Sequence, residues 1–261
     1  MILQRAFIVA GFLVFIVPEG SLSQNALEFA RPSVQSCNKP SYVSKVHLKQ
    51  EDYTQSIHYM ASVPELTKGF TTHFWLNLHN VNRNATVLSY ALGLHQLDTL
   101  VLKYVGGGTM PLWELTLNGT VVFRQPVKPL IQGQWHHITT TWATSTDLWT
   151  LFQDGDVVAE GKSLQEVNRA VPGGGTVVVG AFQKTLVNGA DDQEEAVEGW
   201  ITYFYLHSQP IGIYEYFQKV WTRRCSSDMA AFNDIIDWVH TPHKLVGGVK
   251  EVKASSSCGS F

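Results

Sequence analysis

Hydrophobic and polar residues alternate along most of the chain after residue 41, in short runs that turn residues separate. In the run 135–142, His137 and Thr141 point to one side of an extended chain, while Ile138 and Trp142 point to the other. A period of two in a run rich in β-branched residues is typical of a strand. Equivalent extended runs are found at residues 42–48, 56–63, 70–79, 86–94, 100–105, 112–123, 135–142, 148–158, 176–181 and 200–206.

Two of these runs contain the sequence of a tight hairpin turn. Asn118-Gly119 interrupts the run 112–123, and Asp154-Gly155 interrupts the run 148–158. Both dipeptides readily adopt the positive φ angles that such turns need. Glycine triplets also separate strands at 106–108 and 173–175, and we interpret them as turns because neither is followed by the helix and lysine of a phosphate-binding loop.

One segment has a helical period instead. After Pro210, the apolar residues of the segment 213–221 form a single stripe, made by Ile213, Tyr214, Phe217, Val220 and Trp221. This pattern predicts one short helix that packs on a sheet face. A chain of 261 residues with 44% hydrophobic content can bury one large core. The fold class that follows is all-β, a two-sheet antiparallel jelly-roll sandwich with one short helix.

The first residues have the composition of a secretory signal. Arg5 precedes an apolar run at 6–17, and small residues precede a cleavage point near Gln24. The predicted organisation is a signal peptide at 1–23, a leader at 24–40 and one domain at 41–261. The apolar run is shorter than the ~20 residues that cross a bilayer, so we expect no membrane insertion in this chain and a secreted, extracellular location.

Charge and short motifs agree with this location. The formal net charge is −3 and the sequence pI is about 6.3, so no basic stripe is present for nucleic acid. Asn84-Ala85-Thr86 and Asn118-Gly119-Thr120 are acceptor sequences for N-glycosylation.

The three cysteines cannot all pair within one chain. Cys225 and Cys258 flank the last part of the sequence, and a disulfide between them would hold a tail with few apolar residues, with a stabilisation of ~3 kcal/mol. Cys37 is then left as a free or intermolecular thiol. The alternative is a bridge from Cys37 to Cys225 or Cys258.

The run around residue 137 resembles the signature of the pentraxin family, which has His, Cys, Ser or Thr, Trp, and Ser or Thr at fixed spacing. His137, Thr141, Trp142 and Thr144 match it, and Thr139 stands at the position of the cysteine. Further similarity at 41–44, 69–71, 89–91 and 233–238 extends the resemblance to residues 41–252. It implies a pentraxin and concanavalin-like sandwich. The ending Ser-Cys-Gly also resembles the pentraxin-type domains in the ectodomains of adhesion G-protein-coupled receptors.

The resemblance also implies features that this chain has lost. The internal disulfide of pentraxins falls on His73 and Thr139, so that bond is absent, and we expect the two side chains to share a hydrogen bond. The positions of the two-calcium site fall partly on Leu97, Phe182 and Lys184, which offer no carboxylate oxygen.

We therefore expect the calcium site to be lost or severely weakened. One weak ion remains conceivable at the remaining oxygen donors, which are Asp98, Gln183, Asp192 and Glu195. No other cofactor is expected. His136 and His137 face opposite sides of their strand, so they do not converge on zinc, and His137 is expected in the core beneath the sheet.

Jelly-roll glycoside hydrolases use two carboxylates on one concave face. The acids at 191–195 are consecutive and point to both sides, which favours a solvated loop, so we expect no enzyme. The predicted function is a secreted or ectodomain recognition and adhesion module of pentraxin type. It would bind an extracellular protein or glycan and could form homo-oligomers. The alternatives are a calcium-dependent, lectin-like pentraxin and, with less support, a glycoside hydrolase.

Overall fold

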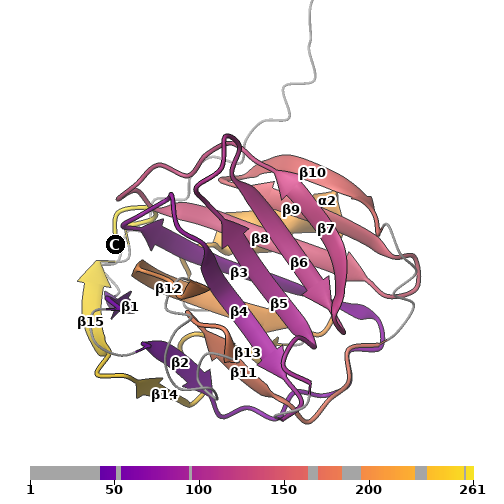
Figure 1. The fold of residues 1–261 in the computed structure, drawn as a ribbon, viewed down its shortest axis with the longest axis horizontal. Helices are drawn as coiled ribbons and strands as arrows, with labels where there is room; N and C mark the ends of the chain where they lie inside the picture. The colour runs from indigo at the N-terminus through magenta and orange to yellow at the C-terminus, as the bar shows by residue number, and fades with distance from the viewer. Residues whose placement is uncertain are drawn as a thin grey trace, which may run out of the picture. The chain divides into compact units, whose positions relative to one another are not determined.

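The computed structural model describes residues 42–50, 54–93, 96–163, 170–183, 195–226, 234–255 and 257–261. This part of the chain forms two antiparallel sheets packed face to face, and the strands β4 to β7 cover β3, β8 and β9 in the view of Figure 1. The predicted sandwich is confirmed.

The first sheet has the order β10 (Asp156–Lys162), β9 (Leu148–Gln153), β8 (His136–Ala143), β3 (Gly69–Leu78), β12 (Gly199–His207), β1 (Tyr42–Leu48), β15 (Lys250–Ser255), and β13 (Asp234–Ile236) also pairs with β12. The second sheet has the order β14 (His243–Val246), β2 (Ser56–Tyr59), β11 (Thr176–Val179), β4 (Ala85–Ala91), β5 (Leu100–Val105), β6 (Leu112–Leu117), β7 (Thr120–Pro126).

The core between the sheets is rich in aromatic rings. The ring of Phe74 on β3 lies 6.2 Å from Trp113 on β6 and 6.1 Å from Phe204 on β12, centroid to centroid. Trp142 on β8 is fully buried beside Phe70. Large rings at these spacings bury much apolar area and fix how the two sheets pack. The alternation in β8 therefore separates a side that faces this core from a side that faces outward, and Ile138 and Trp142 lie on the core side.

Both predicted hairpins form. Asn118 and Gly119 have φ angles of 48° and 75°, and Asp154 and Gly155 have φ angles of 54° and 91°. Gly155 has a second reason to be glycine, since a Cβ atom there would lie 2.6 Å from the indole ring of Trp221. The turn between β9 and β10 thus passes directly against the helical segment.

The helix is present, but its buried face differs from the prediction. It runs as α2 (Ile213–Glu215), the π-helical η2 (Tyr216–Val220) and the 3-10 turn η3 (Trp221–Arg223). A π-helical turn holds more residues than an α-helical turn and so rotates the apolar stripe. Tyr216 and Val220 are buried, whereas Ile213 and Tyr214 are 41% and 71% exposed. The assignment of Ile213 and Tyr214 to the packed stripe was wrong.

Sequence reasoning missed the two last strands. β15 pairs with β1 over six residues, although the sequence analysis described this segment only as a tail with few apolar residues. Its strand is mostly exposed and only Ala254 is buried, so no alternation was available to reveal it. β14 pairs with β2 at the edge of the second sheet. Helices long and apolar enough to cross a membrane do not occur in the described ranges.

Candidate functional site

The outer face of the second sheet is where the pentraxin resemblance places metal ligands, and Gln183 is fastened onto it. Ser89 on β4 lies between Val178 on β11 and Val101 on β5. The side-chain amide of Gln183 donates to the carbonyl oxygens of Ser89, at 2.9 Å, and of Thr176, at 2.8 Å. Both protons of this amide are thereby used within the chain.

A cluster of charges lies further along the same face. Lys103 on β5 places its Nζ atom 3.1 Å from Oε1 of Glu195 and 3.9 Å from Oε1 of Glu114 on β6. Arg124 on β7 also pairs with Glu114. The side chains of Lys103, Glu114 and Glu195 are 20%, 10% and 30% exposed, so these pairs are only partly screened by water. Two carboxylates are thus matched by two cations of the protein itself.

Asp98 lies in the turn before β5. Its carbonyl oxygen accepts a hydrogen bond from the backbone N–H of Gly119 in the β6–β7 turn. Lys103 follows Asp98 by five residues, and the part of β5 from Leu100 to Lys103 alone spans roughly 10 Å. Asp98 is therefore remote from the carboxylate of Glu195.

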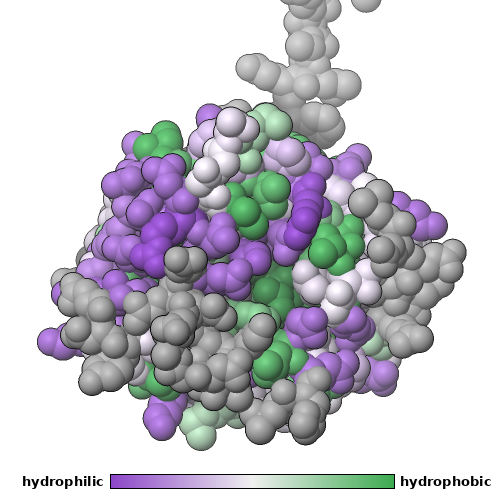
Figure 2. Space-filling model, viewed as in Figure 1, coloured by the Kyte–Doolittle hydropathy of each residue, from purple (hydrophilic) through white to green (hydrophobic). Residues whose placement is uncertain are grey.

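Of the four predicted calcium ligands, the structure describes Asp98, Gln183 and Glu195, and Asp192 lies outside the described residues. Within the described ranges, no group of three His, Cys, Asp or Glu side chains is arranged to hold a metal ion. Hydrophilic side chains cover much of the face over β4 to β7, with hydrophobic ones between them (Figure 2).

The residues of the pentraxin-like signature have structural roles. Trp142 is in the core, and Thr141 joins the sheet to the helical segment: its Oγ1 accepts from the N–H of Ile211, at 3.1 Å, and donates to the carbonyl of Phe70, at 3.3 Å. Thr144, at the end of β8, is buried, and its N–H donates to the carbonyl of Lys68. The signature thus marks the strand on which the helical segment is anchored.

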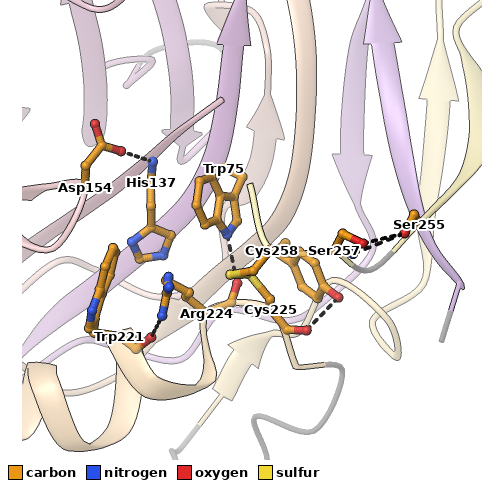
Figure 3. Close-up of a disulfide and its surroundings, with 10 residues drawn as sticks. Trp75, His137, Asp154, Trp221, Arg224, Cys225, Ser255, Ser257 and Cys258 are labelled. Atoms are coloured by element: carbon orange, nitrogen blue, oxygen red, sulfur yellow. Dashed lines mark hydrogen bonds between the residues drawn. A yellow bond between two sulfur atoms is a disulfide. The ribbon is translucent and has the colours of Figure 1, made fainter. Parts of the chain in front are cut away.

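The two adjacent histidines face opposite sides, as expected. Nε2 of His136 accepts from the N–H of Ile131, so Nδ1 carries the proton and donates to the carboxylate of Asp154 at 2.7 Å. His137 is fully buried, but its predicted place in the core beneath the sheet was wrong: it lies on the outer face of the first sheet, against Trp221 of the helical segment. Figure 3 shows its ring between those of Trp75 and Trp221, with Arg224 nearby.

His73 and Thr139 are cross-strand neighbours, as the resemblance implied. The hydrogen bond expected between them is not formed, and both ring nitrogens of His73 lack a partner among the described residues. The ring instead stacks toward β12, with its centroid 4.8 Å from Tyr205 and 5.2 Å from His207. Stacking on these rings directs His73 away from Thr139.

The disulfide Cys225–Cys258 is confirmed, and Cys37 lies outside the described residues. The bond joins the end of the helical segment to the tail after β15 (Figure 3). The tail continues to Phe261, whose ring contacts three partly or fully buried aromatic rings, those of Trp75, Trp135 and Tyr203. Sequence reasoning missed this docking, although an aromatic residue after a polar tail was the available signal.

The predicted glycosylation acceptors lie at strand ends. Asn84 directly precedes β4, Asn118 occupies the β6–β7 turn, and both are partly exposed. Their modification stays a prediction.

Comparisons with known proteins show which family this chain belongs to. Residues 49–195 match the family described as the concanavalin A-like lectin/glucanases superfamily. Human neuronal pentraxin-2 is 30% identical over 190 residues, which are 73% of this chain and 41% of that protein. The chain therefore spans less than half the length of this curated relative.

Solved structures show the same fold. A heptameric SAP-like pentraxin from Limulus polyphemus matches with a TM-score of 0.68 and 16% identity, over 84% of this chain and 98% of that one. The full extracellular region of zebrafish Gpr126/Adgrg6 matches with a TM-score of 0.58 and 16% identity, over 83% of this chain and 27% of that one. The chain belongs to the concanavalin A-like lectin/glucanases superfamily, and its resemblance to the pentraxins is confirmed.

Proposed function

We propose that this chain is a non-catalytic, extracellular recognition module of pentraxin type that binds a protein or glycan ligand without calcium. The observation that carries the proposal is the position of Lys103, whose ammonium contacts both Glu195 and Glu114. A protein cation thus lies among the carboxylates of the face on which pentraxins are expected to hold metal.

Charge balance supports a loss of metal binding. A calcium ion needs six to eight oxygens and several uncompensated carboxylates. Glu195 and Glu114 are each paired with a side-chain cation, and Leu97 and Phe182 stand at ligand positions without a side-chain oxygen. A divalent ion at this place would have to displace Lys103 and would gain few ligands.

Calcium titration tests the proposal. The melting temperature of the mature protein is measured in a chelator and in increasing calcium, and we expect no change. A native-state site filled at one hundred times its dissociation constant would add about 2.7 kcal/mol. For a domain of this size, that is a shift of roughly 5 to 10 °C. A saturable shift of this kind would contradict the proposal and favour the calcium-dependent, lectin-like alternative.

A matched variant controls this assay. Lys103→Met removes the internal cation and leaves Glu195 and Glu114 with less compensation. We expect it to show a larger calcium response than the wild type. An equal absence of response in both proteins would mean that the missing donors, rather than Lys103, account for the loss.

The hydrolase alternative has a separate test. The mature protein is incubated with a panel of glucans, and release of reducing sugar is measured alongside Glu195→Gln. We expect no release from either protein. Activity in the wild type that Glu195→Gln abolishes would establish catalysis at this face.

Assembly is a further part of the proposed function. The Limulus structure is described as heptameric, which makes a closed ring of identical subunits the model for this chain. Light scattering coupled to size-exclusion chromatography gives the mass directly. A mass that stays that of one chain at all concentrations would remove the proposed homo-oligomer.

A further inference from the structure

Three histidines form a row on the outer face of the first sheet. His73 on β3 lies between His137 on β8 and His207 on β12, with ring centroids 5.5 Å and 5.2 Å away. All three are buried, with at most 1% of their surface exposed. We call them the histidine row. The row is separate from the charged residues on the outer face of the second sheet.

The rings of His73 and His137 are buried without hydrogen bonds. Both nitrogens of each ring lack a partner in the part of the chain that the structure describes. A neutral imidazole can tolerate this better than an imidazolium, which needs a counter-ion or several acceptors when it is out of water. The closed structure therefore favours the neutral form of both imidazole rings.

Among the described residues, no carboxylate forms a hydrogen bond with either of these two rings. The titratable and charged groups that face the row come from five elements: Tyr205 and His207 on β12, Asp234 on β13, Tyr216 on η2, Arg224 after η3, and Asp154 and Asp156 at the β9–β10 turn. Asp234 contacts Nδ1 of His207 at 2.5 Å and is thus already engaged.

Burial is the main cause that keeps the rings neutral. It lowers the pKa of His73 well below 6.5, and the neighbouring His207 and His137 act in the same direction. It lowers the pKa of His137 to about 3, with Arg224 acting in the same direction and Asp154 opposing it.

The row borders a segment that has its own small core, and the ring of Trp221 in that segment lies 5.7 Å from the ring of His137. Residues 211–224, which we call the helical cover, bury Ile211, Tyr216 and Val220 against Phe152 of β9 in a cluster separate from the main core. The cover is otherwise held by the bond from Ile211 to Thr141 and by the indole N–H of Trp75, which donates to the carbonyl of Arg224. Small cooperative units of this kind can open while the rest of a domain stays folded.

We propose that the helical cover is released by acid: protonation of His73 and His137 stabilises a state in which residues 211–224 separate from the first sheet while the sandwich remains intact. The disulfide Cys225–Cys258 keeps the opened segment tethered to the tail. Opening exposes the histidine row and the ring of Trp75 to solvent and to any partner that binds aromatic surface.

The expected size follows from linkage. A ring that is neutral when covered and titrates near 6.5 when exposed raises the opening constant by about 25-fold between pH 7 and pH 5. Two independent rings, His73 and His137, raise it by up to about 600-fold.

Hydrogen exchange followed by mass spectrometry tests the proposal on the mature protein. Amide exchange in residues 211–224 is measured between pH 7 and pH 5 and corrected for the intrinsic rate at each pH. We expect the opening constant of the cover to rise several-hundred-fold, with little change in β5 and β6. Absence of a rise in the cover, or an equal rise in β5 and β6, would overturn the proposal.

Variants test whether the rise in the opening constant depends on the rings of His73 and His137. His73→Phe and His137→Phe each replace a neutral buried ring by an apolar one of similar size, and each should reduce the rise to about 25-fold. The double variant should abolish it. His240→Gln changes a histidine whose side chain is 71% exposed and should behave as the wild type. If one phenylalanine variant does not fold, the other still decides, since an unchanged rise in either variant contradicts the proposal.

Discussion

On the outer face of the first sheet, His73 and His137 are fully buried, and His137 lies against Trp221 of the helical cover. On the outer face of the second sheet, Lys103 pairs with Glu114 and Glu195, and all three side chains keep partial contact with solvent. Both faces belong to one sandwich with one core. The first gains apolar burial at the cost of polar atoms without partners, and the second keeps water and opposite charges together.

Because of this difference, the two faces should respond to different solution conditions. Buried neutral imidazoles make the first face depend on pH, because the penalty for charging them is large. Partly exposed ion pairs make the second face depend on salt and contribute little stability. We therefore expect large effects from changes beneath or beside the helical cover and small effects from changes at the charged face.

Removal of the disulfide should have the largest effect on the first face. Cys225 and Cys258 enclose a loop with a sequence separation of 33, for which the loss of the bond costs about 3.5 kcal/mol. Urea denaturation of the double variant Cys225→Ser and Cys258→Ser should show this loss in the free energy of unfolding. Cys37→Ser is the control and should leave that value unchanged; a loss of equal size there would show that Cys37 has a structural partner.

Acid should destabilise the first face next. The pKa of His137 in the folded chain, about 3, lies below its ordinary value of 6.5, so its contribution to stability is fully present above pH 6.5 and declines as the pH falls towards 3. Between pH 7 and pH 5 this residue alone should cost about 2 kcal/mol. Urea denaturation at pH 7 and pH 5 gives the loss of unfolding free energy between the two pH values. We expect this loss to be smaller by about 2 kcal/mol in His137→Phe than in the wild type. A difference that is unchanged in the variant would show that His137 is not the group that titrates.

The anchor of the cover should have an intermediate effect. Thr141→Val keeps the shape of the side chain but leaves the N–H of Ile211 without its acceptor, which costs about 1 to 3 kcal/mol. Thr140→Val is the matched control, since Thr140 is equally buried and its hydroxyl makes only a 3.4 Å bond to the carbonyl of Thr150. Equal losses in the two variants would mean that the bond to Ile211 contributes nothing specific.

The strands could be predicted where one side of the chain differs from the other. Ile138 and Trp142 enter the core while His137 does not, so alternation revealed β8. β15 has almost no buried residue, so its pairing with β1 left no pattern in the sequence. The buried face of the helical segment was misread because the π-helical turn shifts which residues contact the sheet.

The residues that come together at the two faces were harder to predict from the sequence than the strands. His73, His137 and His207 are distant in the sequence, and only the order of β8, β3 and β12 brings them together. Lys103 has no motif of its own, and it contacts Glu195 across a sequence separation of 92 residues. Cys225 and Cys258 could be paired because a tail with few apolar residues gains most from a covalent attachment.

The charged face should show the smallest effect on stability. Lys103→Met removes two ion pairs that are partly exposed, and we expect a change in the free energy of unfolding below about 1 kcal/mol. Added salt should reduce that change further, because it screens these pairs in the wild type. The measurement is urea denaturation of both proteins at low and high ionic strength. A loss above 2 kcal/mol that persists in high salt would mean that Lys103 stabilises the second face by packing, and the contrast between the two faces would then no longer be one of buried against solvated polar groups.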